Sequence, residues 1–220
     1  MPLLIDIRKL RIINQLIKDG ADNVASALES MAGVESTVKI KSLAFIDPED
    51  ISTQIGDSPR HSARVRLREP PYGVFFLTFG DETAAEIAGL MTGIDASEGF
   101  NDMHQSALEE ICNIMTSGFI DGIANTLDTT IDMGTPEVSR GSGQEIADES
   151  LTHINQDSLS IVLDALVDMA DRDAAFEIRI FLVPDPGAFV NVIDKIDLED
   201  LSSAADGEYV DELDAEELDN

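Results

Sequence analysis

The sequence predicts a mixed α/β fold of the α+β kind: an internally duplicated, pseudo-twofold domain in which two long helices cover a mainly antiparallel sheet. Two observations predict it. A long amphipathic helical pattern occurs twice, and each time it is followed by three strand patterns and a short helix. Because a helix and a sheet each bury one apolar face, the two sets of elements are expected to share a core.

The first half opens with a helical pattern from Asp6 to Met31. Its apolar residues recur at steps of three and four, at Ile13, Leu16, Ile17, Val24 and Leu28. Alternating or β-branched and aromatic segments predict strands at Val38–Phe45, Ser62–Glu69 and Tyr72–Phe79. The segment between the first two strands contains Pro48 and Gly56 and is expected to be a loop. A short helix follows, with Asp81 as its N-cap and Gly93 at its end.

The second half has the same order of elements. A long helix is predicted from Asn101 to Leu127, with an apolar stripe at Leu108, Ile111, Met115, Phe119, Ile123 and Leu127. A strand-like segment at Thr129–Val138 and a polar loop through Glu149 come next. Two further strands are predicted at Leu159–Met169 and Ala175–Val183, and a short helix is expected after Pro184 and Pro186.

A shift of 95 positions lays the polar face of the first long helix on that of the second, so that Gln15 matches Glu110 (110 − 15 = 95) and Lys18 matches Asn113 (113 − 18 = 95). We therefore expect one domain over residues 1–196, with repeat one at about 6–93 and repeat two at about 101–196. Two independent domains are the alternative, but no linker separates the halves. Residues 197–220 are an acidic tail, expected to be disordered or to become a helix on a partner.

The formal net charge of −30 over 220 residues argues against nucleic acid and anionic lipid as partners. A nucleic-acid mimic and a protein from a salt-rich cytoplasm would both be this acidic. The acidic residues spread over the whole chain and Lys is scarce, which is typical of a solvated surface and not of one patch. This pattern favours the salt-rich cytoplasm, where the Debye length falls to about 3 Å at 1 M salt.

The other composition features narrow the class of protein. No apolar stretch approaches the ~20 residues that cross a bilayer, so we expect a soluble, cytoplasmic chain without a signal peptide or membrane anchor. Cys112 is the only cysteine, so an intramolecular disulfide is excluded. We expect this residue to be a small core residue and not a nucleophile. The three histidines lack metal-ligand spacing, so no metal site is expected.

Glu110 and Asn113 are the candidate functional residues. Positions three apart are neighbours on one face of a helix, here the face opposite Leu108, Ile111 and Met115. The pair is thus expected to face outward, where a second protein could reach it. The spacing alone is equally typical of two solvated residues on a polar helix face.

The segment SALEEICNIMTSGFIDGIANTL (106–127) resembles the signature helix of the CheC/CheX/FliY chemotaxis phosphatases, in which Glu is followed after two residues by Asn. FLVPDPGAFVNVIDKI (181–196) is similar to the last strand, proline turn and final helix of this family. The duplicated layout resembles CheC in particular. The resemblance covers nearly all of the chain up to residue 196.

The resemblance implies hydrolysis of the aspartyl phosphate on the response regulator CheY. It implies that Glu110 pairs with the active-site Lys of the regulator and that Asn113 orients the attacking water. It implies no covalent intermediate on this chain and no cofactor of its own, since Mg²⁺ is carried by CheY. The alternative is an adaptor that binds CheD or an archaeal motor-signalling protein, through a surface such as the final short helix near Ala188–Ile196.

The first half departs from the family pattern. CheC proteins often carry two such sites, whereas Gln15 and Lys18 stand at the positions equivalent to Glu110 and Asn113. A Gln side chain cannot form the ion pair, and an ammonium group cannot accept a hydrogen bond from water. Matching Asn14 instead would place Arg11 at the Glu position and would not restore the site. The sequence therefore predicts a protein with one site.

The charge predicts a large dependence of folding on salt. At low ionic strength the repulsion within a chain of charge −30 is unscreened, so we expect loss of compactness. Circular dichroism recorded from about 3 M to 0.1 M salt measures this. An unchanged spectrum over that range would contradict the salt-adapted interpretation.

Overall fold

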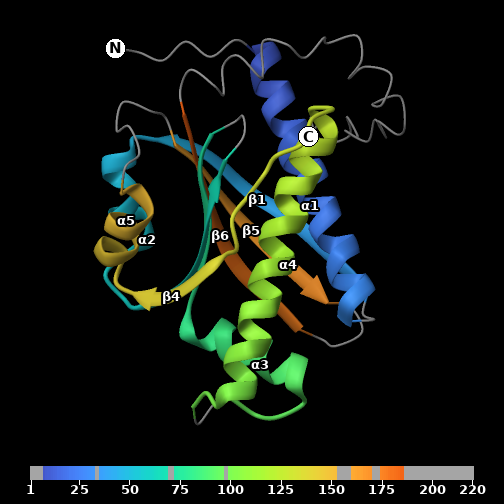
Figure 1. The fold of residues 1–220 in the computed structure, drawn as a ribbon, viewed down its shortest axis with the longest axis vertical. Coiled ribbons are helices and arrows are strands. Elements are labelled where there is room, and N and C mark those ends of the chain that lie inside the picture. Colours follow the sequence, from blue (N-terminus) through green and yellow to red (C-terminus); the bar gives the residue numbers. More distant parts are fainter. Residues whose placement is uncertain are drawn as a thin grey trace, which may run out of the picture.

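The computed structural model describes residues 7–32, 35–68, 72–96, 99–152, 160–169 and 174–185. The helices are α1 (Ile7–Ala32), α2 (Ile51–Ile55), α3 (Asp81–Thr92), α4 (Asp102–Thr126) and α5 (Gly143–Leu151), with a 3₁₀ turn at Pro48–Asp50. The strands are β1 (Ser36–Ile46), β2 (Arg60–Leu67), β3 (Gly73–Phe79), β4 (Glu137–Gly141), β5 (Ser160–Met169) and β6 (Ala174–Pro184). Figure 1 shows α1 and α4 side by side along the sheet, with α3 beneath them.

The six strands form one sheet in the order β1-β5-β6-β3-β2-β4, and every neighbouring pair is antiparallel. The order is symmetric about its centre, where β6 of the second half pairs with β3 of the first. On either side, the first strand of each half pairs with the second strand of the other: β1 with β5, and β4 with β2. Strands of both halves thus interleave within one sheet, whereas two independent domains would be expected to form two.

The two long helices meet at a close crossing. A Cβ on Gly122 of α4 would lie 2.5 Å from the Asp19 carbonyl oxygen and 2.6 Å from the Gly20 Cα, so the backbones touch there. The Asn23 side-chain amide donates to the Gly118 carbonyl oxygen at 2.7 Å, and the Thr126 hydroxyl donates to the Asp19 carboxylate. Asn23 and Gly118 are 95 positions apart, and equivalent residues touch only near a twofold axis. The crossing therefore supports the predicted register.

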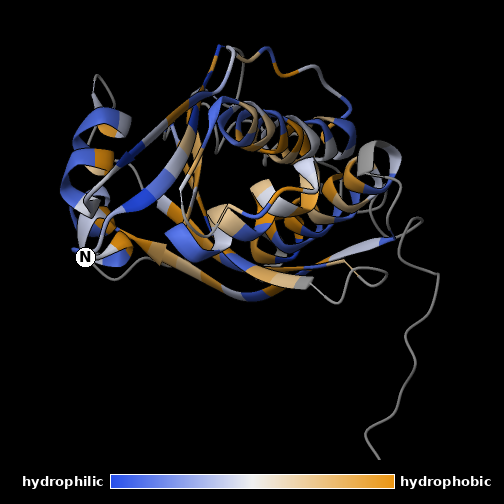
Figure 2. Ribbon diagram, turned by 90° about the horizontal axis from the view of Figure 1, so that it is seen from below, coloured by the Kyte–Doolittle hydropathy of each residue, from blue (hydrophilic) through white to orange (hydrophobic). Residues whose placement is uncertain are grey.

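The main core lies between these helices and one face of the sheet. Every apolar residue of the predicted stripe on α1 is buried. The predicted stripe on α4 is also buried from Leu108 to Ile123. The Phe119 ring of α4 packs on the Phe75 ring of β3, with centroids 5.3 Å apart. Figure 2 shows the long helices on one side of the sheet, with apolar colours concentrated between the layers. The predicted fold class is confirmed.

The opposite face of the sheet is covered by α2 and α5, where loops were expected. Ile51 and Ile55, four residues apart, place one apolar edge of α2 on the sheet, and Ile146 does the same for α5. Beneath them the Phe76 and Phe181 rings stack with centroids 4.6 Å apart. Helices this short are marginal alone, so burial against the sheet stabilises them more than any pattern of their own. The loop prediction followed the polar, Pro- and Gly-rich composition and overlooked a local signal of α5, the capping box of Ser142 and Glu145.

Two further predictions were wrong in detail. The strand expected at Thr129–Val138 begins only at Glu137, preceded by a single bridge between Met133 and Leu67. Asp81 is the first residue of α3 and not its N-cap, which is Gly80. The Asp81 carboxylate instead accepts hydrogen bonds from Arg140, so tertiary pairing replaces the local capping bond. Gly93 does end the helix, with a φ of 71°.

The final short helix and the acidic tail at 197–220 lie outside the described residues. Within the part of the chain that the structure describes, no helix combines the length and the apolar character that crossing a membrane requires.

The crossing makes Gly122 sensitive to substitution. Gly122→Ala would normally stabilise a helix interior by about 1 kcal/mol, but here the new methyl must displace backbone atoms of α1. We expect a net loss of about 1–3 kcal/mol in the free energy of unfolding, measured by denaturant titration in high salt.

Gly89→Ala in α3 is the matched control for this substitution. Its Cβ would meet only the Ile94 carbonyl oxygen, at 3.4 Å, so we expect no loss of stability. Equal effects from Gly122→Ala and Gly89→Ala would contradict the close crossing.

Candidate functional site

The candidate site lies on α4, whose start is held by reciprocal hydrogen bonds. The Asn101 side-chain oxygen accepts from the His104 backbone N–H at 2.9 Å, and the Asn101 N–H donates to the His104 ring at 3.3 Å. The other ring nitrogen of His104 lies 3.2 Å from the Ile94 carbonyl oxygen, which anchors the turn before α4. This capping box stabilises the first turn of the helix.

Glu110 and Asn113 are both exposed on the outer face of α4, opposite buried Leu108, Ile111 and Met115. Among the described residues, neither side chain has a hydrogen-bond or ion-pair partner. The adjacent carboxylate differs, since Glu109 accepts from the Gln105 side-chain amide at 2.9 Å along the helix. The predicted pair thus stands free where an approaching molecule could contact it.

The backbone beneath the pair is rigidly placed. Cys112 and Ile114, on either side of Asn113, are buried in the main core. One turn later the Ser117 hydroxyl donates to the Asn113 carbonyl oxygen at 2.8 Å. That hydroxyl is therefore occupied by the helix backbone and leaves the Asn113 carboxamide free. Binding to a preorganised group costs less ordering entropy than binding to a mobile one.

The surface around the pair is acidic. No Lys or Arg occurs between Arg68 and Arg140, an interval that includes all of α3 and α4. Exposed Asp121 and Glu109 add negative charge on α4 itself. A free carboxylate in such a field favours a cationic group on whatever binds there.

The equivalent positions on α1 are arranged differently. The Gln15 side-chain amide donates to the Asp19 carboxylate at 2.7 Å, so it lies along the helix and is half-buried. Lys18 is exposed and lines a groove of about 440 Å³ between α1 and β1, together with Ile17, Val38 and Leu43. The structure shows no free carboxylate–carboxamide pair at this position.

Cys112 lies between Glu110 and Asn113 in sequence but faces the opposite way. It is fully buried, and burial together with the charge of Glu109 raises the pKa of its thiol to about 12. A thiol with this pKa is uncharged at neutral pH and is a poor nucleophile. The burial agrees with the predicted role as a core residue.

A second polar cluster, which the sequence did not predict, joins three elements. Arg140 of β4 donates two hydrogen bonds to the Asp81 carboxylate, at 2.7 and 2.6 Å, and the His61 ring of β2 lies 3.1 Å from the same group. The bond from Arg140 lowers the pKa of Asp81, while burial lowers the pKa of His61. His61 also stacks on Phe79. The Asp81 carboxylate thus joins α3 to Arg140 of β4 and His61 of β2.

In the described ranges, no three His, Cys, Asp or Glu side chains are arranged to hold a metal ion. The candidate site itself supplies a carboxylate, from Glu110, and a carboxamide, from Asn113.

The sequence is similar to those of known proteins. Residues 103–140, which contain Glu110 and Asn113, match the CheC-like family. A Halobacterium salinarum protein named "Putative CheY-P phosphatase CheC1" is 40% identical over 198 residues, which are 89% of this chain and 100% of that protein. The chain belongs to the CheC-like family.

Solved structures share the fold at low sequence identity. The crystal structure of Thermotoga maritima FliY matches with a TM-score of 0.71 and 16% identity, covering 88% of this chain and 99% of the other. The FliM middle domain from H. pylori matches with a TM-score of 0.60 and 13% identity, covering 87% and 100%. At this level of identity the matches show a shared fold. In this chain α4 is one of the two long helices that cover the sheet.

The buried thiol generates a prediction for Cys112. At pH 8 a thiol of pKa about 12 is ionised about a thousandfold less than one of pKa about 9, so we expect native protein to react at least that much more slowly with a thiol reagent such as DTNB. The unfolded protein in guanidinium is the control. Stoichiometric labelling of the native protein within minutes would contradict the buried position.

Proposed function

We propose that this protein is a phosphatase of chemotaxis that hydrolyses the aspartyl phosphate of CheY. One observation carries the proposal: Glu110 and Asn113 lie exposed on one face of α4, with no partner among the described residues, within the segment that matches the CheC-like family. The name of the Halobacterium relative, with its CheY-P substrate, supports the same assignment.

In this proposal Glu110 docks the partner. Its free carboxylate pairs with the active-site Lys of the regulator, and the absence of nearby Lys and Arg on α3 and α4 leaves the carboxylate fully available. A charge-assisted hydrogen bond is stronger and more directional than a neutral one. The helix is thereby set in register with the phosphoryl group of the partner.

Asn113 acts on the water. A carboxamide accepts a hydrogen bond from water through its oxygen and donates to a phosphoryl oxygen through its nitrogen. Both contacts position the water for attack on phosphorus, in line with the aspartate leaving group. Phosphoryl transfer requires mainly such positioning and charge stabilisation, so no nucleophile on this chain is needed.

The required energy is modest. A hundredfold acceleration corresponds to about 2.7 kcal/mol of transition-state stabilisation. Hydrogen bonds to charged groups contribute about 1.5–3 kcal/mol each. Two groups held in place by α4 are therefore sufficient, with the Mg²⁺ carried by the regulator and no cofactor on this chain.

The site operates in one half only. Gln15 is engaged with Asp19, and Lys18 offers donors but no acceptor for a water proton.

In the adaptor alternative the chain binds CheD or a motor-signalling protein, and the pair on α4 serves only to dock CheY. The two functions differ in whether the protein accelerates loss of the phosphate from CheY. The decay rate of phosphorylated CheY, measured in high salt, distinguishes them.

Substitution of Asn113 tests the phosphatase. The cognate CheY is phosphorylated with a small-molecule phosphodonor in high salt with Mg²⁺, and its decay is followed with and without the protein. We expect wild-type protein to accelerate decay and Asn113→Ala to return it to the spontaneous rate, a loss of about a hundredfold, because the water is no longer oriented.

Lys18→Ala is the matched control, since it changes the equivalent position of α1, and we expect its rate to equal that of the wild type. Equal loss in Asn113→Ala and Lys18→Ala would overturn the one-site assignment. No acceleration by the wild type, even with CheD present, would favour the adaptor.

A further inference from the structure

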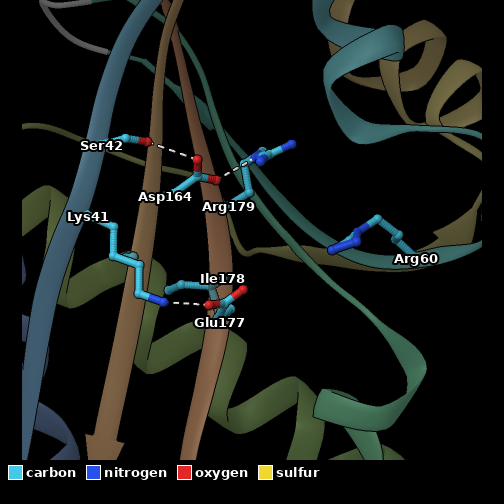
Figure 3. Close-up of a pocket in the computed structure, with 8 residues that line it drawn as sticks. Lys41, Ser42, Arg60, Asp164, Glu177, Ile178 and Arg179 are labelled. Carbon is cyan, nitrogen blue, oxygen red and sulfur yellow. Dashed lines mark hydrogen bonds and ion pairs between the residues drawn. The ribbon is translucent and has the colours of Figure 1, made fainter.

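A basic opening lies on the sheet face that carries α2 and α5, on the far side of the sheet from Glu110 and Asn113. It has a volume of about 390 Å³ and is bordered by charged side chains from four strands: Lys41 of β1, Arg60 of β2, Asp164 of β5, and Glu177 and Arg179 of β6. Figure 3 shows Arg60 and Arg179 extending toward the same opening from β2 and β6. Positive charge gathers here in a chain of formal charge −30.

Two of the three cations have internal partners. The Arg179 Nε donates to Asp164 at 2.6 Å, and its Nη1 donates to the Gln54 carbonyl oxygen of α2. The Lys41 ammonium pairs with Glu177. With three cations and two carboxylates, the opening has a net charge of +1 (3 − 2 = 1). The guanidinium of Arg60 supplies this excess.

Arg60 differs from the other arginines of β2. On the same face of the strand, Arg64 pairs with Glu137 and Arg66 donates to the Thr152 carbonyl oxygen. Arg60 has no hydrogen-bond or ion-pair partner among the described residues, although it is partly buried. In a chain with 44 Asp and Glu, an unpaired, partly buried guanidinium is a site for a carboxylate that comes from elsewhere.

Protection of the sheet edge does not account for these cations. Lysines on an edge strand discourage pairing with other chains, and Lys41 lies on edge strand β1. Arg60 and Arg179, however, lie on inner strands of the sheet, where no free edge needs protection. Their convergence from separate strands is typical of a binding surface.

We propose that this basic opening binds the acidic C-terminal stretch 197–220 of the same chain, through carboxylates that contact Arg60 and Arg179. The stretch contains 11 Asp and Glu and no Lys or Arg, so its charge is complementary to the opening. This binding is independent of the proposed phosphatase function, because it uses the other face of the sheet.

The length of the chain permits this contact. The described residues end at Asp185, directly after β6, the strand that carries Arg179. Six residues separate the two positions, or about 20 Å at ~3.3 Å per strand residue. With the expected short helix at 188–196, about 14 Å long at ~1.5 Å per residue, and residues 186 and 187 extended over about 7 Å, the linking residues span about 20 Å, so the acidic stretch can return to the opening.

Zero-length cross-linking of the full-length protein tests the proposal. A carbodiimide joins a Lys amine to a carboxylate that is in contact with it, and peptide mass spectrometry identifies the pair. Lys39 and Lys41 are the reporters, since Lys41 borders the opening and Lys39 lies between Val38 and Ile40, which pack on the opposite face. We expect both to join carboxylates of residues 197–220, with Lys41–Glu177 as the internal positive control.

Arg60→Glu should lower the yield of these cross-links by about fivefold or more, because it replaces the attraction with repulsion. Arg11→Glu is the matched control, since Arg11 is an exposed base on α1, and we expect it to leave the yield unchanged. Circular dichroism verifies that both variants fold, and Arg60→Gln replaces Arg60→Glu if the latter does not.

Several results would overturn the proposal. One is the absence of cross-links from Lys39 and Lys41 to residues 197–220. An unchanged yield in Arg60→Glu would show that the opening is not the binding site. In a mixture of ¹⁴N- and ¹⁵N-labelled protein, cross-links that join the two labels would assign the stretch to a second copy and reject binding within one chain.

Discussion

The contact between α1 and α4 is the constraint on which the rest of the structure depends. The Gly122 backbone lies against Asp19 and Gly20, and Asn23 bonds to Gly118, so the two halves are joined at their symmetry axis. The strands repeat this arrangement, because the first strand of each half pairs with the second strand of the other. In the part of the chain that the structure describes, the strands of each half are therefore completed by strands of the other within one sheet.

A fold held together at its axis leaves the outer faces of the long helices free to diverge. Both helices bury a similar apolar stripe, which packing maintains. The exposed positions carry no such constraint. On α4, Glu110 and Asn113 have no partner within the described ranges, while on α1 the Gln15 side chain bonds to Asp19. The exposed functional residues of one half can thus be replaced while the fold and the residues of the other half stay the same.

Charge is distributed unevenly over the two faces of the sheet. The helices on one side include the long interval without Lys or Arg, whereas Lys41, Arg60 and Arg179 converge on the other side. In a chain of net charge −30, the acidic residues keep the molecule solvated, and three of its 14 Lys and Arg residues border this one opening. The two faces are therefore suited to partners of opposite charge.

Periodicity in the sequence determined the long helices, most of the strands and the duplication, because the apolar stripes of α1 and α4 repeat at helical spacing whatever surrounds them. It also placed Glu110 and Asn113 together on one helix face. Only the tertiary structure decided that α2 is a helix, that Asp81 pairs with Arg140, and that Arg60 has no partner among the described residues. Each of these depends on groups brought together from distant parts of the chain, and a local pattern carries no information about partners supplied by the fold.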